Sequence, residues 1–418
     1  MADEKREKYM KKSALLVLCL GAAGAAHAQN NVTLYGVVTG GVGYVNKIGL
    51  TPASARQTGS RWGVDSGQYT QSRFGMRGTE DLGGGLKANF VLEGGLTIDN
   101  GASGQGGATF GRRTTIGLTG SAGTIELGRR KDYTDIIAVQ FATTTRMLPF
   151  TAKAHANNLD RATGSRGNNM AFYLTPEWNG FQGNLAYAFG ERAGDFRNGR
   201  AFGFGGTYKN GPFAIGAAYW QSHKGNVVAA AGTTPASNSS SDDGATSGAG
   251  CNTAALGSSG DTCLKVIVVG ASYKLGDALL RGQYSHVSQP LVNASSGAAP
   301  NFATIFSASA GSAAFTAGGI NNRKANVFDL GVDYKLGQWL LKGAVIHSRY
   351  DFIGASNSGK LTVLAAGADY NLTRRTLLYG MAGVMKASDM YSPGLTANGA
   401  PGVDNSQMAM MAGVLHRF

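Results

Sequence analysis

The sequence is poor in charge and lacks long apolar runs. Charged residues make up 15% of the 418-residue chain, well below the roughly 25% of an ordinary soluble protein. After residue 28 no apolar run approaches the ~20 residues that a spanning helix needs, which excludes a bundle of membrane helices. Only 9 prolines are present, whereas glycine is abundant at 64 residues. The glycines follow no period of three, so collagen is excluded. What remains is a large, glycine-rich chain that favours β-structure.

The first 28 residues predict a secretory signal peptide. Lys11 and Lys12 precede an apolar run over residues 14–26, which ends in the small-x-small sequence AHA at 26–28. A basic start, a short apolar stretch and a small-residue exit are typical of such peptides, so we expect cleavage after Ala28. A short membrane anchor is the alternative, and the run is too short for it. Met10 looks like the natural start of the chain.

Cleavage would change both the cysteine count and the charge. It removes Cys19 and leaves Cys251 and Cys263. An even number in an exported chain favours a disulfide, which would pin a loop and contribute roughly 3 kcal/mol. Neither a second cysteine pair nor clustered histidines accompany them, so a zinc site is not expected. The formal net charge falls from +13 to +11, because five basic and three acidic residues are lost.

Apolar residues in the rest of the chain recur with a period of two. Such alternation predicts strands that are apolar on one side only. A weak repeat, GASYKLGD at 270–277 and GVDYKLGQ at 331–338, places a tyrosine before each tight turn. The tyrosines in this position are Tyr208, Tyr273, Tyr334 and Tyr370. Copies are irregularly spaced, so a solenoid or propeller of fixed period does not fit.

Short and long connections alternate along the chain. We expect seven tight turns, near residues 81–85, 122–123, 177–180, 210–211, 276–277, 337–338 and 372–373. We expect eight longer loops, near residues 46–69, 99–109, 132–165, 191–200, 225–263, 289–323, 351–359 and 387–405. Fifteen connections imply sixteen strands. Strands of about 10 residues, an even count and short turns on one edge are typical of a transmembrane antiparallel β-barrel in an outer membrane. The tyrosines would then form an aromatic belt at the lipid boundary.

Several segments resemble the Gram-negative general porins, in particular the trimeric kind from beta-proteobacteria. They are VTLYGVV at 32–38, SRFGMRGTEDLGGGLKA at 72–88, FGRRTTIGL at 110–118, RGNNM at 166–170 and GVLHRF at 413–418. The resemblance covers essentially all of residues 29–418 and fades in the long loops. It implies a homotrimer, a third long loop folded into the lumen, and a terminal Phe418 that acts as a signal to the barrel-assembly machinery.

The third long loop, residues 132–165, is unusually apolar for a loop. Water-exposed loops have no use for so many bulky apolar groups, so we expect this one to pack against something. Tyr133, Ile137 and Phe141 recur at four-residue spacing behind Asp132, which predicts a short helix with Asp132 as N-cap. The alternative is a partly apolar surface loop at a trimer contact.

Successive residues of a strand point to opposite faces, and this parity assigns charged residues to the lumen. With Phe74 and Met76 facing lipid, Arg73 and Arg77 face the interior, and both are candidates for the wall of the pore constriction. The same argument places four further charges in the lumen, namely Lys87, Glu93, Arg281 and Lys342.

In anion-preferring members of the family, wall arginines face the constriction loop. The matching positions here are Arg73, one of Arg112 and Arg113, and Arg166. Alternation with Ile116 and Leu118 favours Arg113, whereas the family motif favours Arg112; a bulge near Gly111 would reconcile them, and both stay candidates. Acidic partners are expected from the loop, with Asp132, Asp135 and Asp160 as candidates.

The sequence therefore predicts an outer-membrane diffusion channel for ions and small hydrophilic solutes, with a preference for anions and no cofactor. A substrate-specific channel or a surface adhesin is the alternative. A barrel enzyme is not expected, because nothing groups the histidines of the mature chain into a site. These are His155, His223, His286, His347 and His416. Nucleic-acid binding is not expected either, because the basic residues are scattered among the strands.

Overall fold

The computed structural model describes residues 31–49, 58–147, 150, 154–155, 166–191, 193–194, 196, 200–222, 264–288, 322–352, 358–389 and 404–418. The predicted signal peptide with its cleavage site at Ala28, the predicted disulfide between Cys251 and Cys263, and Asp160 lie outside these residues and stay predictions.

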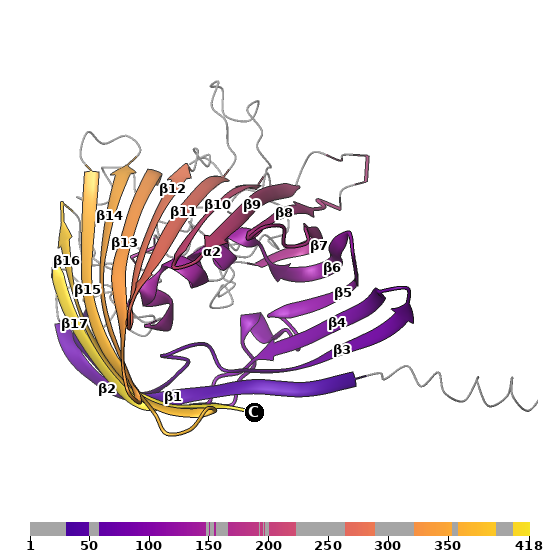
Figure 1. Ribbon diagram of the computed structural model, residues 1–418. Coiled ribbons are helices and arrows are strands. Elements are labelled where there is room, and N and C mark those ends of the chain that lie inside the picture. The colour runs from indigo at the N-terminus through magenta and orange to yellow at the C-terminus, as the bar shows by residue number, and fades with distance from the viewer. Residues whose placement is uncertain are drawn as a thin grey trace, which may run out of the picture.

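One antiparallel sheet contains all the described strands (Figure 1). They are β1 (Asn31–Gly49), β2 (Thr58–Ser66), β3 (Arg73–Gly83), β4 (Leu86–Gly95), β5 (Arg113–Gly120), β6 (Gly123–Lys131), β7 (Arg166–Leu174), β8 (Phe181–Ala188), β9 (Ala201–Asn210), β10 (Phe213–Ser222), β11 (Leu264–Leu275), β12 (Ala278–Ser288), β13 (Asn322–Leu336), β14 (Trp339–Phe352), β15 (Ser358–Asn371), β16 (Thr376–Ser388) and β17 (Ser406–Arg417). The helical elements are α2 (Tyr133–Phe141) and two 3-10 turns, Gln105–Gly107 and Thr143–Arg146.

The sheet closes on itself through β1 and β17. Val37 lies opposite Arg417 and Val45 opposite Ala409, and the backbone of Phe418 exchanges hydrogen bonds of 3.1 and 3.2 Å with Gly36. Closure leaves no open sheet edge, which lipid could not satisfy with hydrogen bonds.

The barrel has sixteen strand positions, as predicted, although seventeen segments are present. β2 pairs with residues 40–49 of β1, and β3 pairs with residues 31–37 of the same strand. The two segments are therefore two halves of one barrel strand, interrupted at residues 67–72.

The connections follow the predicted alternation with one correction. All seven predicted tight turns join neighbouring strands. The expected loop at 46–69 is wrong in its extent, because β1 continues to Gly49 and residues 58–66 form β2. The short β2 alternates Trp62 and Val64, which point outward, with Arg61 and Asp65, which bond each other. This pattern is too brief to stand out in the sequence.

The outer surface is apolar, whereas the inner one combines charged and polar residues with an apolar part on β10–β16. Trp62, Ile116 and Leu185 are at least 60% exposed, as expected of side chains that face lipid. Ile125 and Leu127 are exposed on the same outer surface, whereas Glu126 between them is buried on the other face. Among the residues described, no helix is long and apolar enough to cross a membrane.

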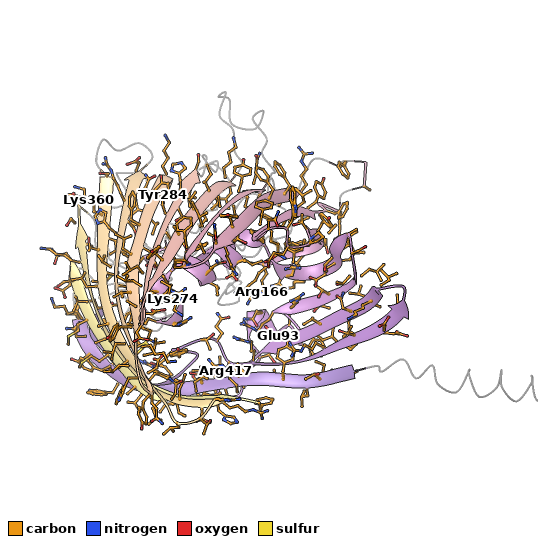
Figure 2. The ribbon with its side chains drawn as sticks, viewed as in Figure 1. Glu93, Arg166, Lys274, Tyr284, Lys360 and Arg417 are labelled. Carbon is orange, nitrogen blue, oxygen red and sulfur yellow. The ribbon has the colours of Figure 1, made fainter. Side chains whose placement is uncertain are left out.

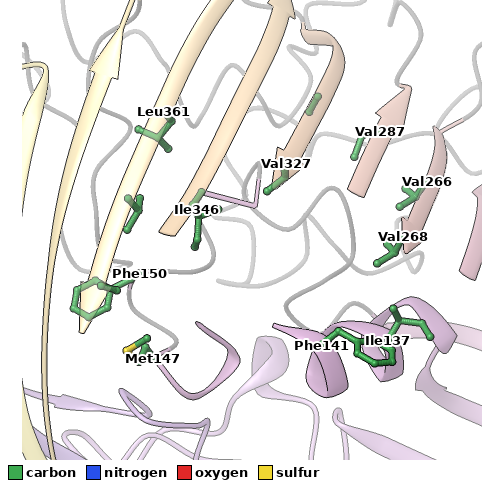
Figure 3. Packing of buried hydrophobic residues seen from close by; sticks show 14 of the residues in the cluster. Ile137, Phe141, Met147, Phe150, Val266, Val268, Val287, Val327, Ile346 and Leu361 are labelled. Carbon is green, nitrogen blue, oxygen red and sulfur yellow. The ribbon is translucent and has the colours of Figure 1, made fainter. Parts of the chain in front are cut away.

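Helix α2 lies against the inner face of β9–β12 (Figure 1). It begins where Asp132 accepts a hydrogen bond of 2.8 Å from the backbone N–H of Thr134, which confirms the predicted N-cap. Ile137 and Phe141 are fully buried and pack near Val266 and Val268 (Figure 3). The helix can approach so closely because the wall has glycines there: a Cβ at Gly216 would lie 2.6 Å from Ile137, and one at Gly270 would lie 2.5 Å from Phe141.

The chain after α2 continues along the same inner wall. Met147 lies 3.3 Å from the position of a Cβ at Gly367, and Phe150 lies 2.8 Å from that at Gly383. Both side chains are fully buried, and they face the region of Ile346 and Leu361 in Figure 3. The described part of residues 132–165 therefore packs inward on strands β9–β16, and the apolar residues of this loop have partners.

Candidate functional site

A cavity of about 790 Å³ occupies the barrel interior between α2 and the opposite wall. Its lining holds eight cationic side chains and three acidic ones, which leaves an excess of five positive charges. The cationic residues are Arg73, Arg112, Arg113, Arg130, Lys131, Arg146, Arg166 and Arg417, and the acidic residues are Glu93, Asp135 and Asp369. Figure 2 shows Glu93 and Arg166 in the open interior.

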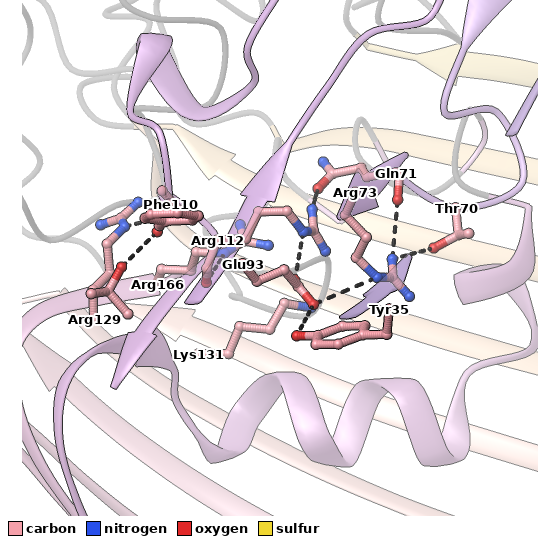
Figure 4. A network of polar contacts seen from close by, with 12 residues as sticks. Tyr35, Thr70, Gln71, Arg73, Glu93, Phe110, Arg112, Arg129, Lys131 and Arg166 are labelled. Atoms are coloured by element: carbon pink, nitrogen blue, oxygen red, sulfur yellow. Dashed lines mark hydrogen bonds and ion pairs between the residues drawn. The ribbon is translucent and has the colours of Figure 1, made fainter. Parts of the chain in front are cut away.

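Glu93 joins two arginines on neighbouring elements (Figure 4). Its Oε1 accepts from Arg112 Nε at 2.8 Å, and its Oε2 lies 3.8 Å from Arg73 Nε. The hydroxyl of Tyr35 also donates to Oε2 at 3.0 Å. Hydrogen bonds to a charged partner fix geometry well, so this carboxylate orients both guanidinium groups. Its single negative charge neutralises only one of their two positive charges.

Arg112 and Arg113 both face the cavity, so the two predicted alternatives do not exclude each other. β5 begins at Arg113, whose Nη2 donates to Glu126 at 2.6 Å. Arg112 precedes the strand, is 6% exposed and donates to Glu93 and Gln71. Parity applies only inside a regular strand, so it could not place Arg112.

Arg166 at the start of β7 is buried and donates from Nε to the carbonyl oxygen of Arg112 at 2.9 Å. Arg130 forms an ion pair with Glu126, and its guanidinium lies 3.4 Å from the ring centroid of Phe172. Such a stack holds the charge in a defined orientation.

The acidic residues of the inner segment have specific partners. Asp132 caps α2 and does not belong to the cavity lining. Asp135 lines the cavity and accepts from Lys131 Nζ at 2.7 and 2.8 Å. Next to them, burial raises the pKa of Tyr133 above its ordinary value, because the interior disfavours the charged phenolate.

Four other predicted charges, among them the expected wall residue Arg77, do not line the cavity. Arg77 is exposed on the inner face of β3, over the ring of Tyr35 at 5.4 Å, and Lys87 is exposed near a tight turn. Lys342 is buried and bonded to Asp369 at 2.6 Å. Arg281 lies 3.0 Å from Asp333. The last two are charges paired with aspartates on a neighbouring strand of the wall.

Sequence reasoning missed four of the cationic lining residues. Arg130 and Lys131 stand in a run of three basic residues directly before Asp132, which was a visible signal. Arg146 lies inside the apolar loop, which has no strand alternation. Arg417 ends β17, and the alternation of this strand, with His416 and Phe418 on one face, was a signal that placed Arg417 on the other face. Only the closure of the barrel brings Arg417 to the cavity.

The arrangement suits electrostatic selection of passing solutes. Fixed charges at a polar constriction set a local barrier or well for ions. Among the residues that the structure describes, no group of three or more His, Cys, Asp or Glu side chains could hold a metal ion.

A closed sheet with an apolar exterior, and with charged residues around an interior cavity, defines the class of outer-membrane β-barrel channels. The particular family follows from the sequence. The model of the Gram-negative porins matches residues 14–390, and the chain belongs to this family.

Known relatives agree with this assignment. The chain is 31% identical over 422 residues to outer membrane porin protein 32 of Delftia acidovorans, covering 98% of this chain and all of the relative. The solved anion-selective porin from Comamonas acidovorans superimposes with a TM-score of 0.63 at 26% identity, covering 93% of this chain and 100% of that one. The trimer form of OmpT from Vibrio cholerae, at 14% identity and a TM-score of 0.57, covers 93% of this chain and 99% of that one and shares the fold.

The protein is therefore an outer-membrane porin of a Gram-negative bacterium, a channel for passive diffusion rather than an enzyme. This confirms the function class, the location and the barrel architecture predicted from the sequence.

Proposed function

We propose that the protein forms a water-filled pore that prefers anions, and that the cationic lining of its central cavity sets this preference. The observation that carries the proposal is the excess of five positive charges around one 790 Å³ cavity. A relative whose solved structure is named an anion-selective porin supports it.

The size of the effect follows from Coulomb's law. A charge about 10 Å from a passing ion contributes about 0.4 kcal/mol in water. Five such charges would give about 2 kcal/mol, which screening at 0.1 M salt lowers to roughly 0.8 kcal/mol. Anions gain this free energy and cations lose it, so the expected anion-to-cation ratio in the cavity is roughly tenfold.

The residues proposed to form the cationic wall are Arg73, Arg112, Arg113 and Arg166, and Arg130, Lys131, Arg146 and Arg417 extend the predicted set. Asp135 is the acidic partner supplied by the inner segment. Arg77, Lys87, Arg281 and Lys342 act only as background charge, because they lie outside the cavity lining.

The reversal potential tests the proposal. The mature protein is inserted into planar bilayers with a tenfold gradient of potassium chloride across the membrane. We expect a reversal potential of the anion-selective sign. A potential of the opposite sign would refute the role of the cationic cavity. Liposome-swelling rates for a sugar, a phosphate ester and an amino acid of equal size distinguish a general pore from a substrate-specific one, because a general pore passes the neutral sugar as well.

We also propose that three copies of the chain assemble, as the resemblance to trimeric porins implies and as the trimer form of a structural relative supports. The small solutes would be anionic or neutral. The proposed partner in biogenesis is the barrel-assembly machinery, through Phe418. Light scattering of the protein in detergent, corrected for bound detergent, should give three times the mass of one chain; the mass of a single chain would contradict the trimer.

A further inference from the structure

Residues 67–72 interrupt the second barrel strand and turn inward. Ser66 lies opposite Gly40 and Arg73 opposite Val37, so these six residues face only two residues of β1. The interruption is hydrogen-bonded on both sides. The N–H of Gly67 donates to the carbonyl of Thr39 at 3.1 Å, and the Ser72 hydroxyl bonds both the N–H and the carbonyl of Thr39 at 3.0 Å. We call residues 67–72 the inward segment.

The tip of the inward segment is anchored to a distant part of the wall. The hydroxyl of Tyr69 donates to Asp369 Oδ2 at 2.7 Å, and the Tyr69 side chain is buried. Its ring lies 5.4 Å from that of Tyr379 and 4.4 Å from Lys342 Nζ. These partners belong to β14, β15 and β16, whereas the inward segment belongs to the strand beyond β17 and β1. The segment therefore reaches past two strands inside the barrel.

The other end of the inward segment holds the arginines of the cavity (Figure 4). Arg112 Nη1 donates to the side-chain oxygen of Gln71. Arg73 Nη1 donates to the carbonyl of Gln71 at 3.0 Å and to the Thr70 hydroxyl at 3.3 Å. Tyr69, Thr70 and Gln71 also line the cavity themselves.

We propose that the inward segment is a second wall of the constriction, facing α2, and that Tyr69 and Gln71 are positioning residues that fix Arg73 and Arg112 for ion selection. This inference rests on the proposed anion preference and names residues that act on it without carrying charge. A guanidinium group on a long side chain otherwise samples many rotamers. Hydrogen bonds from the anchored segment restrict both arginines to one place, so their field acts on every passing ion at the same distance.

A substitution that removes a single oxygen tests the anchor. Tyr69→Phe keeps the ring and every formal charge of the cavity, and it loses only the bond to Asp369. We expect the anion-to-cation permeability ratio to fall about twofold, because the arginines move relative to the ion path. The matched control is Tyr370→Phe, next to Asp369 on the opposite face of β15, where the ring packs 4.8 Å from that of Trp339. The control should leave the ratio unchanged.

The readouts separate positioning from general stability. Permeability ratios come from reversal potentials in bilayers, and thermal unfolding of both variants is followed by circular dichroism. A lower ratio for Tyr69→Phe than for Tyr370→Phe supports the proposal. A ratio for Tyr69→Phe equal to that of the parent, in a parent that is anion-selective, overturns it. A parent that is not anion-selective refutes the proposed function instead.

A second variant tests the wall directly and does not depend on selectivity. Deleting residues 68–71 leaves two residues opposite Val38 and Thr39, so that β2 and β3 can continue as one strand. We expect a higher single-channel conductance, because four residues leave the lumen. An unchanged or lower conductance would overturn the assignment of the segment as a wall. If this variant does not assemble, Tyr69→Phe still decides the question.

Discussion

At the scale of single residues, the cavity holds more cations than its carboxylates can neutralise. Glu93 forms ion pairs with Arg73 and Arg112, and Glu126 forms ion pairs with Arg113 and Arg130. Each carboxylate fixes two guanidinium groups in space and leaves one positive charge uncompensated. An arginine held in this way presents a defined field to the ion path, because its hydrogen bonds to a carboxylate fix the position of the charge.

Arg73 offers the sharpest test of this principle. Arg73→Glu changes the excess charge of the lining from five to three, so we expect the anion-to-cation ratio to fall about threefold in 0.1 M salt. The matched control is Arg77→Glu, which makes the same charge change on the same face of β3 but outside the cavity lining. Reversal potentials measure both. Equal shifts for the two variants would mean that total charge, rather than position at the cavity, determines selectivity.

The alternation of apolar and polar residues gives each residue of a regular strand an expected face. Arg73 and Glu93 alternate with apolar neighbours, and both side chains reach the cavity. It could not rank Arg73 above Arg77, because both share one face and only the position of the inner segment distinguishes them. It also could not find Gln71, since an uncharged side chain in an irregular stretch gives no periodic signal.

At the scale of elements, the inner segment is held by shape rather than by charge. Ile137 and Phe141 fit against glycines of β10 and β11, where any larger residue would collide with them. The sequence predicted α2 from its apolar spacing and its N-cap. It could not show which wall the helix meets, because the partner glycines lie more than 70 residues further along the chain.

Gly270→Ala tests this contact. The added Cβ would lie 2.5 Å from Phe141 Cβ, so the helix must move or the wall must deform. We expect a loss of about 1–3 kcal/mol in folding free energy, typical of overpacking, together with a changed single-channel conductance. Gly380→Ala is the control, since its Cβ would meet nothing within 4 Å. Urea unfolding in lipid vesicles measures the free energy. If both variants behaved alike, the close fit of α2 would not matter.

At the scale of the whole molecule, the number of barrel strands was predictable from the sequence. The electrostatic field inside the pore was not. Alternating short turns and long loops gave sixteen strands, and the structure has sixteen positions because β2 and β3 share one. The net charge of the chain is a poor guide to ion selectivity, because some charges of the barrel form buried ion pairs, such as that of Lys342 with Asp369. The charge that matters is the local excess in the cavity, which depends on closure bringing Arg417 near Arg73.

If selection arises from this local field, the anion preference must depend on salt concentration. The screening length is about 10 Å at 0.1 M salt and about 3 Å at 1 M. The expected anion-to-cation ratio therefore falls from roughly tenfold at 0.1 M to near one at 1 M, with the gradient across the bilayer kept constant as a ratio. The swelling rate of liposomes in a neutral sugar is the control and should stay constant once osmotic strength is matched, because screening does not change the width of the pore. A permeability ratio independent of salt would place selection in direct, desolvated contacts instead, since only charges acting through water are screened in this way.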